Sequence, residues 1–133
     1  MNKIIIPYHL VIPAVISFGF LLIILIKRKQ FFKTEMQKML GISLTVFFAF
    51  YFYTVASAAL YELYYQWDFY KYDLNKDGLF FGNEITKEQQ TAMTKLTNDG
   101  GRNIKFKTGL ISSAIIAIIV FGIGRVYQLS KKK

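Results

Sequence analysis

Three long apolar runs constrain this chain more than any other feature of its sequence. They cover approximately residues 4–26, 39–60 and 108–127. An α-helix needs about 20 residues, each rising 1.5 Å, to cross the hydrocarbon core of a bilayer, and each run is long enough. The sequence therefore predicts an all-α integral membrane protein. We expect a three-span helical bundle that forms a single membrane domain over residues 1–133.

A cleaved secretory signal peptide is the alternative interpretation of the first run. In a signal peptide the positive charge precedes the apolar region, and a small-residue cleavage site follows it. Here the basic segment KRKQFFK, residues 27–33, follows the run instead. This order favours an uncleaved membrane span.

The basic residues gather beside the apolar runs. The net charge of +9 would suggest nucleic-acid binding in a soluble protein. However, residues 27–38 carry five Lys or Arg, and the chain ends in Lys131, Lys132 and Lys133. Dense Lys and Arg in short loops mark the cytoplasmic side. We therefore expect no nucleic-acid partner, residues 27–38 and the C-terminus in the cytoplasm, and the N-terminus and residues 62–107 outside, in a periplasm, cell exterior or organelle lumen.

One motif between the second and third runs carries chemistry. Residues 73–84 read DLNKDGLFFGNE. Acidic and amide side chains alternate at its start, a glycine stands at the sixth position and a glutamate at the twelfth. This segment resembles the calcium-binding loop of the EF-hand family, in which oxygen ligands occupy positions 1, 3, 5, 7, 9 and 12. The resemblance is local, and we identify no family for the whole chain.

The resemblance implies a Ca²⁺ site and assigns a role to each loop residue. The implied ligands are Asp73, Asn75, Asp77, the Leu79 carbonyl, a water at the place of Phe81, and Glu84. Gly78 would form the sharp turn, and Phe80 would pack inward. The alternative is a metal-free turn, because Asn, Asp and Gly are ordinary turn residues. That alternative predicts neither the even spacing nor Glu84.

The flanking residues predict a helix-loop-helix over about residues 62–101, outside the membrane. Aromatic residues lead into the loop, at Tyr65, Phe69 and Tyr72. Thr86 and Gln89 form a capping-box pattern, which places the start of the outgoing helix near Lys87. Ala92, Met93 and Leu96 would form its apolar face, and residues 98–101 would end it. EF-hands usually work in pairs, but this chain has one loop.

Small residues recur every four positions in the third run, at Gly109, Ser113 and Ala117. Such a stripe lets another helix approach closely. Three spans leave much surface facing lipid. We therefore expect the bilayer, and other membrane subunits or further copies of the chain, as partners.

No catalytic signature is present, so the sequence favours neither an enzyme nor a small-molecule substrate. The leading hypothesis is an accessory subunit of a membrane complex, with Ca²⁺ stabilising its extramembrane segment. One alternative is a calcium-responsive membrane regulator. A weaker alternative is an oligomeric channel component, with Glu62, Asp68 or the loop carboxylates forming an outer ring.

Overall fold

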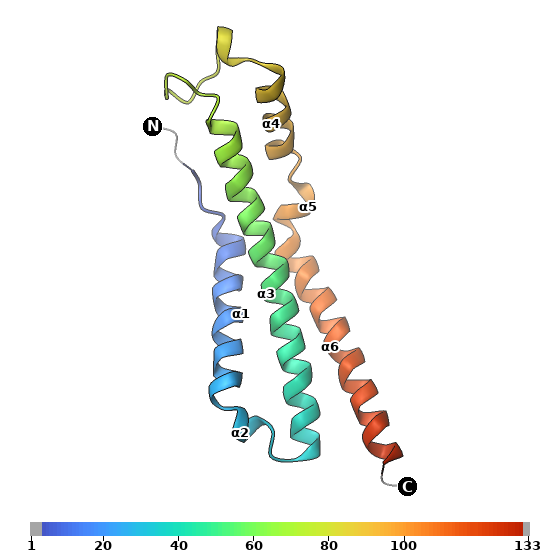
Figure 1. Ribbon diagram of the computed structural model, residues 1–133. Coiled ribbons are helices and arrows are strands. Elements are labelled where there is room, and N and C mark those ends of the chain that lie inside the picture. The colour runs from blue at the N-terminus through green and yellow to red at the C-terminus, as the bar shows by residue number, and fades with distance from the viewer. Residues whose placement is uncertain (1–3, 132–133) are drawn as a thin grey trace.

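The computed structural model describes residues 4–131 and is all-α over that range, without a β-strand (Figure 1). Lys132 and Lys133 of the basic tail lie outside the described residues. The elements, in chain order, are α1 (Tyr8–Ile26), α2 (Arg28–Phe31), α3 (Glu35–Tyr70), the 3₁₀ turn η1 (Gly82–Glu84), α4 (Lys87–Thr97), α5 (Gly100–Asn103) and α6 (Lys105–Ser130).

Three of these helices are long and apolar enough to cross a membrane, as the sequence predicts. They are α1, α3 and α6, with 19, 36 and 26 residues. At 1.5 Å per residue, α3 is about 54 Å long, whereas the hydrocarbon core is about 30 Å thick. A spanning α3 would therefore extend well beyond the bilayer, and its end would carry the loop of residues 71–86.

Two helix starts follow from local chemistry. The first helix begins at Tyr8, four residues later than the run of residues 4–26 suggests, because Pro7 is its N-cap and the residue before a proline disfavours helix. The start of α3 is fixed by a capping box, in which Thr34 Oγ1 accepts from Gln37 N and Gln37 Oε1 accepts from Thr34 N.

The long helix α3 lies between α1 and α6 and contacts both along their lengths, whereas α1 and α6 touch each other much less (Figure 1). Gly109 and Ser113 are buried on α6. A Cβ at Gly109 would lie 2.8 Å from Thr54 Cγ2. The small-residue stripe thus meets α3 of the same chain at Gly109, while Ser113 is buried and Ala117 is half-buried.

Residues 27–38 and the C-terminal end of α6 lie at one end of the molecule, here called the basic end, and the candidate calcium loop lies at the other (Figure 1). At the basic end, Gln128 Nε2 of α6 donates to the Glu35 carbonyl oxygen of α3 at 2.6 Å. At the opposite end, α4 packs beside the last turns of α3. This arrangement is compatible with the predicted topology, since one membrane face would receive both basic segments.

Candidate metal centre

The EF-hand-like loop leaves the end of α3 and turns back to meet its own beginning. Asp73 and Glu84, its first and twelfth residues, are buried at 4% and 8% exposure. The Phe80 ring packs against Phe69 of α3, with centroids 4.5 Å apart. Phe80 therefore points inward toward the helix, as the family pattern implies.

The sharp turn lies at Gly78. Its φ angle is +85°, a left-handed conformation that side chains with a Cβ disfavour. Its N–H donates to Asp73 Oδ2 at 2.8 Å, so the turn is hydrogen-bonded to the first loop residue. The glycine at the sixth position thus has the backbone conformation that this position requires.

Glu84 joins the two ends of the loop through backbone amides. Its Oε1 accepts from Leu74 N at 2.9 Å and from Asn75 N at 3.2 Å, and its Oε2 accepts from Phe81 N at 3.3 Å. The carboxylate therefore points into the loop. It sits in the 3₁₀ turn η1 and precedes the outgoing helix α4.

The middle of the loop is stabilised by short-range polar contacts. Asp77 Oδ1 accepts from Leu79 N at 2.7 Å, and Asn75 Oδ1 accepts from Asp77 N at 3.0 Å. Asn75 Nδ2 also donates to Asp77 Oδ2 at 2.8 Å. Leu79 and Phe81 are exposed. These contacts form an ordered turn in which the two polar side chains face each other.

In this conformation the loop carboxylates accept hydrogen bonds from backbone amides. Within residues 4–131, no group of three His, Cys, Asp or Glu side chains is gathered in an arrangement that could hold a metal ion. One atom stands apart, because Asp73 Oδ1 is buried without a hydrogen-bond partner. Buried polar atoms are nearly always satisfied. A hard cation, which prefers oxygen ligands, would bind this atom, and the loop contains further carboxylate, amide and carbonyl oxygens that could act as ligands.

The outgoing helix begins where the capping pattern predicts, at Lys87, with Thr86 Oγ1 accepting from Gln89 N at 3.1 Å. Its buried face differs from the expected one. Gln89 and Ala92 are buried, whereas Met93 is 48% exposed. Met93 lies four positions after Gln89 and neighbours it on the helix surface, yet its side chain is exposed. The buried part of α4 therefore combines Ala92 with the polar Gln89, which the expected apolar face of Ala92, Met93 and Leu96 does not include.

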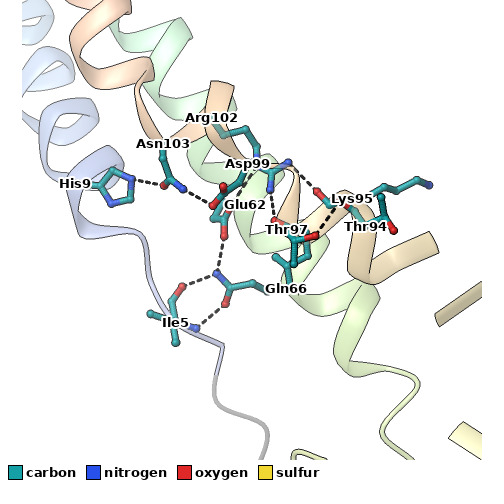
Figure 2. A network of polar contacts seen from close by, with 11 residues as sticks. Ile5, His9, Glu62, Gln66, Thr94, Lys95, Thr97, Asp99, Arg102 and Asn103 are labelled. Atoms are coloured by element: carbon teal, nitrogen blue, oxygen red, sulfur yellow. Dashed lines mark hydrogen bonds and ion pairs between the residues drawn. The ribbon is translucent and has the colours of Figure 1, made fainter. Parts of the chain in front are cut away.

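A polar network links α4 to the long helix α3 (Figure 2). Its centre is Arg102, whose Nε donates to Glu62 Oε2 at 3.0 Å. Its two terminal nitrogens donate to the carbonyl oxygens of Lys95 and Leu96, at 3.0 and 2.8 Å. The guanidinium also lies over the Tyr65 ring, 4.7 Å from its centroid. One side chain thus pairs with α3 and caps the end of α4.

The network continues to the N-terminal segment and to α1 (Figure 2). Gln66 pairs with the backbone of Ile5, accepting from Ile5 N at 2.7 Å and donating to Ile5 O at 2.9 Å. His9 Nε2 lies 2.8 Å from Asn103 Oδ1, and Asn103 Nδ2 donates to Asp99.

From the sequence, Glu62 is expected only as a carboxylate of an outer channel ring, and neither Arg102 nor Gln66 is expected to take part in a site. A usable signal exists in the spacing of Glu62 and Gln66, because residues four apart share a helix face. That spacing marks one polar stripe on an otherwise aromatic helix end.

The two carboxylates considered for a pore ring are both engaged with cations of the same chain. Glu62 pairs with Arg102. Asp68 Oδ1 accepts from Lys71 Nζ at 2.5 Å, and this hydrogen bond raises the pKa of Lys71. A ring built from Glu62 or Asp68 would therefore have to break these pairs.

Comparison of the chain with protein-family models, with curated proteins and with solved structures found no match. Its function is therefore inferred from its own residues.

Proposed function

We propose that this chain is a multi-pass membrane protein that binds Ca²⁺ in the loop Asp73–Glu84, and that the ion clips α3 to α4. The proposal places the loop on the non-cytoplasmic side and gives the chain an accessory role in a larger membrane assembly. The observation that carries it is Asp73 Oδ1, a buried carboxylate oxygen without a donor, at the first position of an EF-hand-like sequence.

The proposed ligands are Asp73, Asn75, Asp77, the Leu79 carbonyl, a water near Phe81, and Glu84. An ion at this place would take over carboxylate oxygens that now accept from backbone amides. Bound Ca²⁺ would supply the positive charge that gathers these oxygens, so it would stabilise the loop by mass action.

A structural clip is favoured over a calcium-responsive regulator by the contacts of α4. In a regulator, the outgoing helix would move when the ion binds. Here α4 packs beside α3, and its residues Gln89 and Ala92 are buried. It is also linked to Glu62 of α3 through Arg102, which caps its last carbonyl groups. These contacts do not involve the loop, so they oppose a free swing of α4.

Calorimetric titration of the detergent-purified full chain with CaCl₂ tests the proposal. We expect one site, a loss of affinity of at least about tenfold in Glu84→Gln, and no change in Glu88→Gln. The control removes an exposed carboxylate of α4 outside the loop. A chain that binds no Ca²⁺, or equal weakening in both variants, would refute the loop assignment.

The Ca²⁺ affinity of the loop also distinguishes a structural clip from a calcium-responsive regulator. Extracellular calcium modules work at dissociation constants of about 10⁻⁴ to 10⁻³ M. A dissociation constant far below the ambient calcium of the compartment keeps the site filled, which fits a clip and excludes a regulator.

A further inference from the structure

A groove runs between α1 and α3 at the basic end of the molecule, away from the calcium loop. Its volume is about 630 Å³, within the range of about 300–1,000 Å³ typical of small-ligand sites. One wall is apolar and comes from α1, including Phe18, Leu22 and Leu25. Thr45 of α3 contributes to the other side.

The groove is bounded at the end of the spans by the turn that joins α1 to α3. Phe32 lines it there and packs closely on α3, since a Cβ at Gly41 would lie 3.0 Å from the Phe32 ring. Arg28 and Lys29 of α2 line the same end. The apolar wall therefore lies at the depth of acyl chains, and the two cations lie where the span ends.

Neither cation has an anionic partner in the described chain. Within residues 4–131, the ion pairs are Lys38–Glu35, Lys71–Asp68 and Arg102–Glu62, and none involves Arg28 or Lys29. The single carboxylate of residues 27–38 is Glu35, which is engaged with Lys38 at 2.6 Å. The positive charge at the groove mouth is therefore unneutralised by those residues.

Other grooves on the spans lack this combination. The groove between α3 and α6 near Phe47 and Ala117, about 360 Å³, has no charged lining residue. Nor has the groove near Val11 and Leu63, about 370 Å³. A groove near Arg125 and Lys131 does contain cations, but Glu35 also lines it.

We propose that an anionic phospholipid binds in the groove between α1 and α3, with its phosphate at Arg28 and Lys29 and an acyl chain along Phe18, Leu22 and Leu25. Basic pockets beside membrane helices hold anionic headgroups by this charge pairing, and an Arg guanidinium matches phosphate oxygens geometrically. The inference rests on the proposed membrane insertion and is independent of the calcium loop.

Native mass spectrometry of the full chain, purified in mild detergent with EGTA, tests this proposal. The probes are phosphatidylglycerol and phosphatidylcholine with identical palmitoyl and oleoyl chains. We expect preferential retention of phosphatidylglycerol. Each cation near a membrane surface contributes about 1 kcal/mol, so Arg28→Gln with Lys29→Gln should weaken this binding roughly 10- to 30-fold. Lys27→Gln with Lys33→Gln makes the same charge change at residues that do not line the groove, and should leave most of the binding intact.

A second pair of variants tests the acyl-chain position. Leu22→Trp fills the groove and should abolish preferential retention, whereas Ile118→Trp places the same bulk in the groove without cations and should not. Equal retention of both lipids, or equal losses in the two charge variants, would overturn the proposal. A dimer that Leu22→Trp dissociates would show a second copy in the groove and would also overturn it.

Alkaline carbonate extraction of membranes distinguishes failure of the lipid-site proposal from failure of the proposed function, which requires membrane insertion. Release of the chain would refute membrane insertion, and with it the lipid site. A chain that resists extraction but shows no headgroup preference would refute the lipid site alone.

Discussion

Arg102 and Glu62 are 40 residues apart in the sequence, yet Arg102 Nε lies 3.0 Å from Glu62 Oε2. Their side chains retain only 15% and 12% exposure. The pair joins the segment after α4 to the C-terminal part of α3. Because the same guanidinium caps α4, this contact links the position of the outgoing helix to the long helix α3.

Arg102→Gln should loosen α4. The substitution leaves Glu62 without its cation and leaves the Lys95 and Leu96 carbonyls without a charged donor. Breaking a buried ion pair typically costs about 3–5 kcal/mol, and the residual exposure here suggests about 2–3 kcal/mol. Hydrogen–deuterium exchange in residues 87–97 should therefore accelerate at least about 30-fold. Lys95→Gln, which changes an exposed side chain of α4, is the control, and equal exchange in both variants would contradict the structural role.

The positions of the three long helices could be predicted from the sequence. Each helix contains a long, uncharged apolar run, and such a run is a local feature of the sequence that is typical of a membrane-spanning helix. The start of α4 could be predicted too, because the cap at Thr86 is a local interaction. The Arg102–Glu62 pair could not, because its partners are distant in sequence and its geometry depends on how α4 folds back. The burial of Gln89 beside Ala92, and the exposure of Met93, could not be predicted either, because the apolar pattern of α4 does not include a polar residue in the buried face.

In the candidate loop, too, some features could be predicted from the sequence and others could not. The left-handed turn at Gly78 and the inward Phe80 follow from the motif. The backbone contacts of Glu84 do not, because they depend on the loop closing on itself. These contacts direct the carboxylate into the loop through backbone amides, and a pattern of ligand positions in the sequence does not describe them.

Asp73→Asn should separate calcium binding from the stability of the calcium-free loop. The carbonyl oxygen of asparagine can still accept from Gly78 N, as Asp73 Oδ2 does. Its amide nitrogen would replace Asp73 Oδ1, which has no hydrogen-bond donor. In EGTA we expect a change in unfolding free energy of at most about 1 kcal/mol. In CaCl₂ the unaltered chain should be stabilised by the ion, and the Asp73→Asn variant should lack this stabilisation. Thermal unfolding in detergent under both conditions measures this, and full calcium stabilisation of the variant would rule out Asp73 as a ligand.

Gly109→Ala should weaken the contact between α3 and α6. The added methyl carbon would lie 2.8 Å from Thr54 Cγ2, so the helices must shift apart or Thr54 must move. Overpacking of this kind costs about 1–3 kcal/mol. Gly122→Ala makes the same chemical change on α6, where the new carbon would meet open space rather than another helix. Unfolding of both variants in detergent gives the comparison, and an equal effect would mean that close approach at Gly109 is not required.

The orientation of the chain can be tested cleanly because it contains no cysteine. Lys95→Cys places a thiol on the exposed face of α4, and Lys33→Cys places one in the basic loop. With residues 62–107 outside, a membrane-impermeant maleimide added to intact cells should label the first variant. The second should react only after lysis, because the positive-inside rule puts residues 27–38 in the cytoplasm. The reverse labelling pattern would invert the topology, and it would expose the calcium loop to the much lower free calcium of the cytoplasm, where a clip of extracellular-type affinity would stay empty.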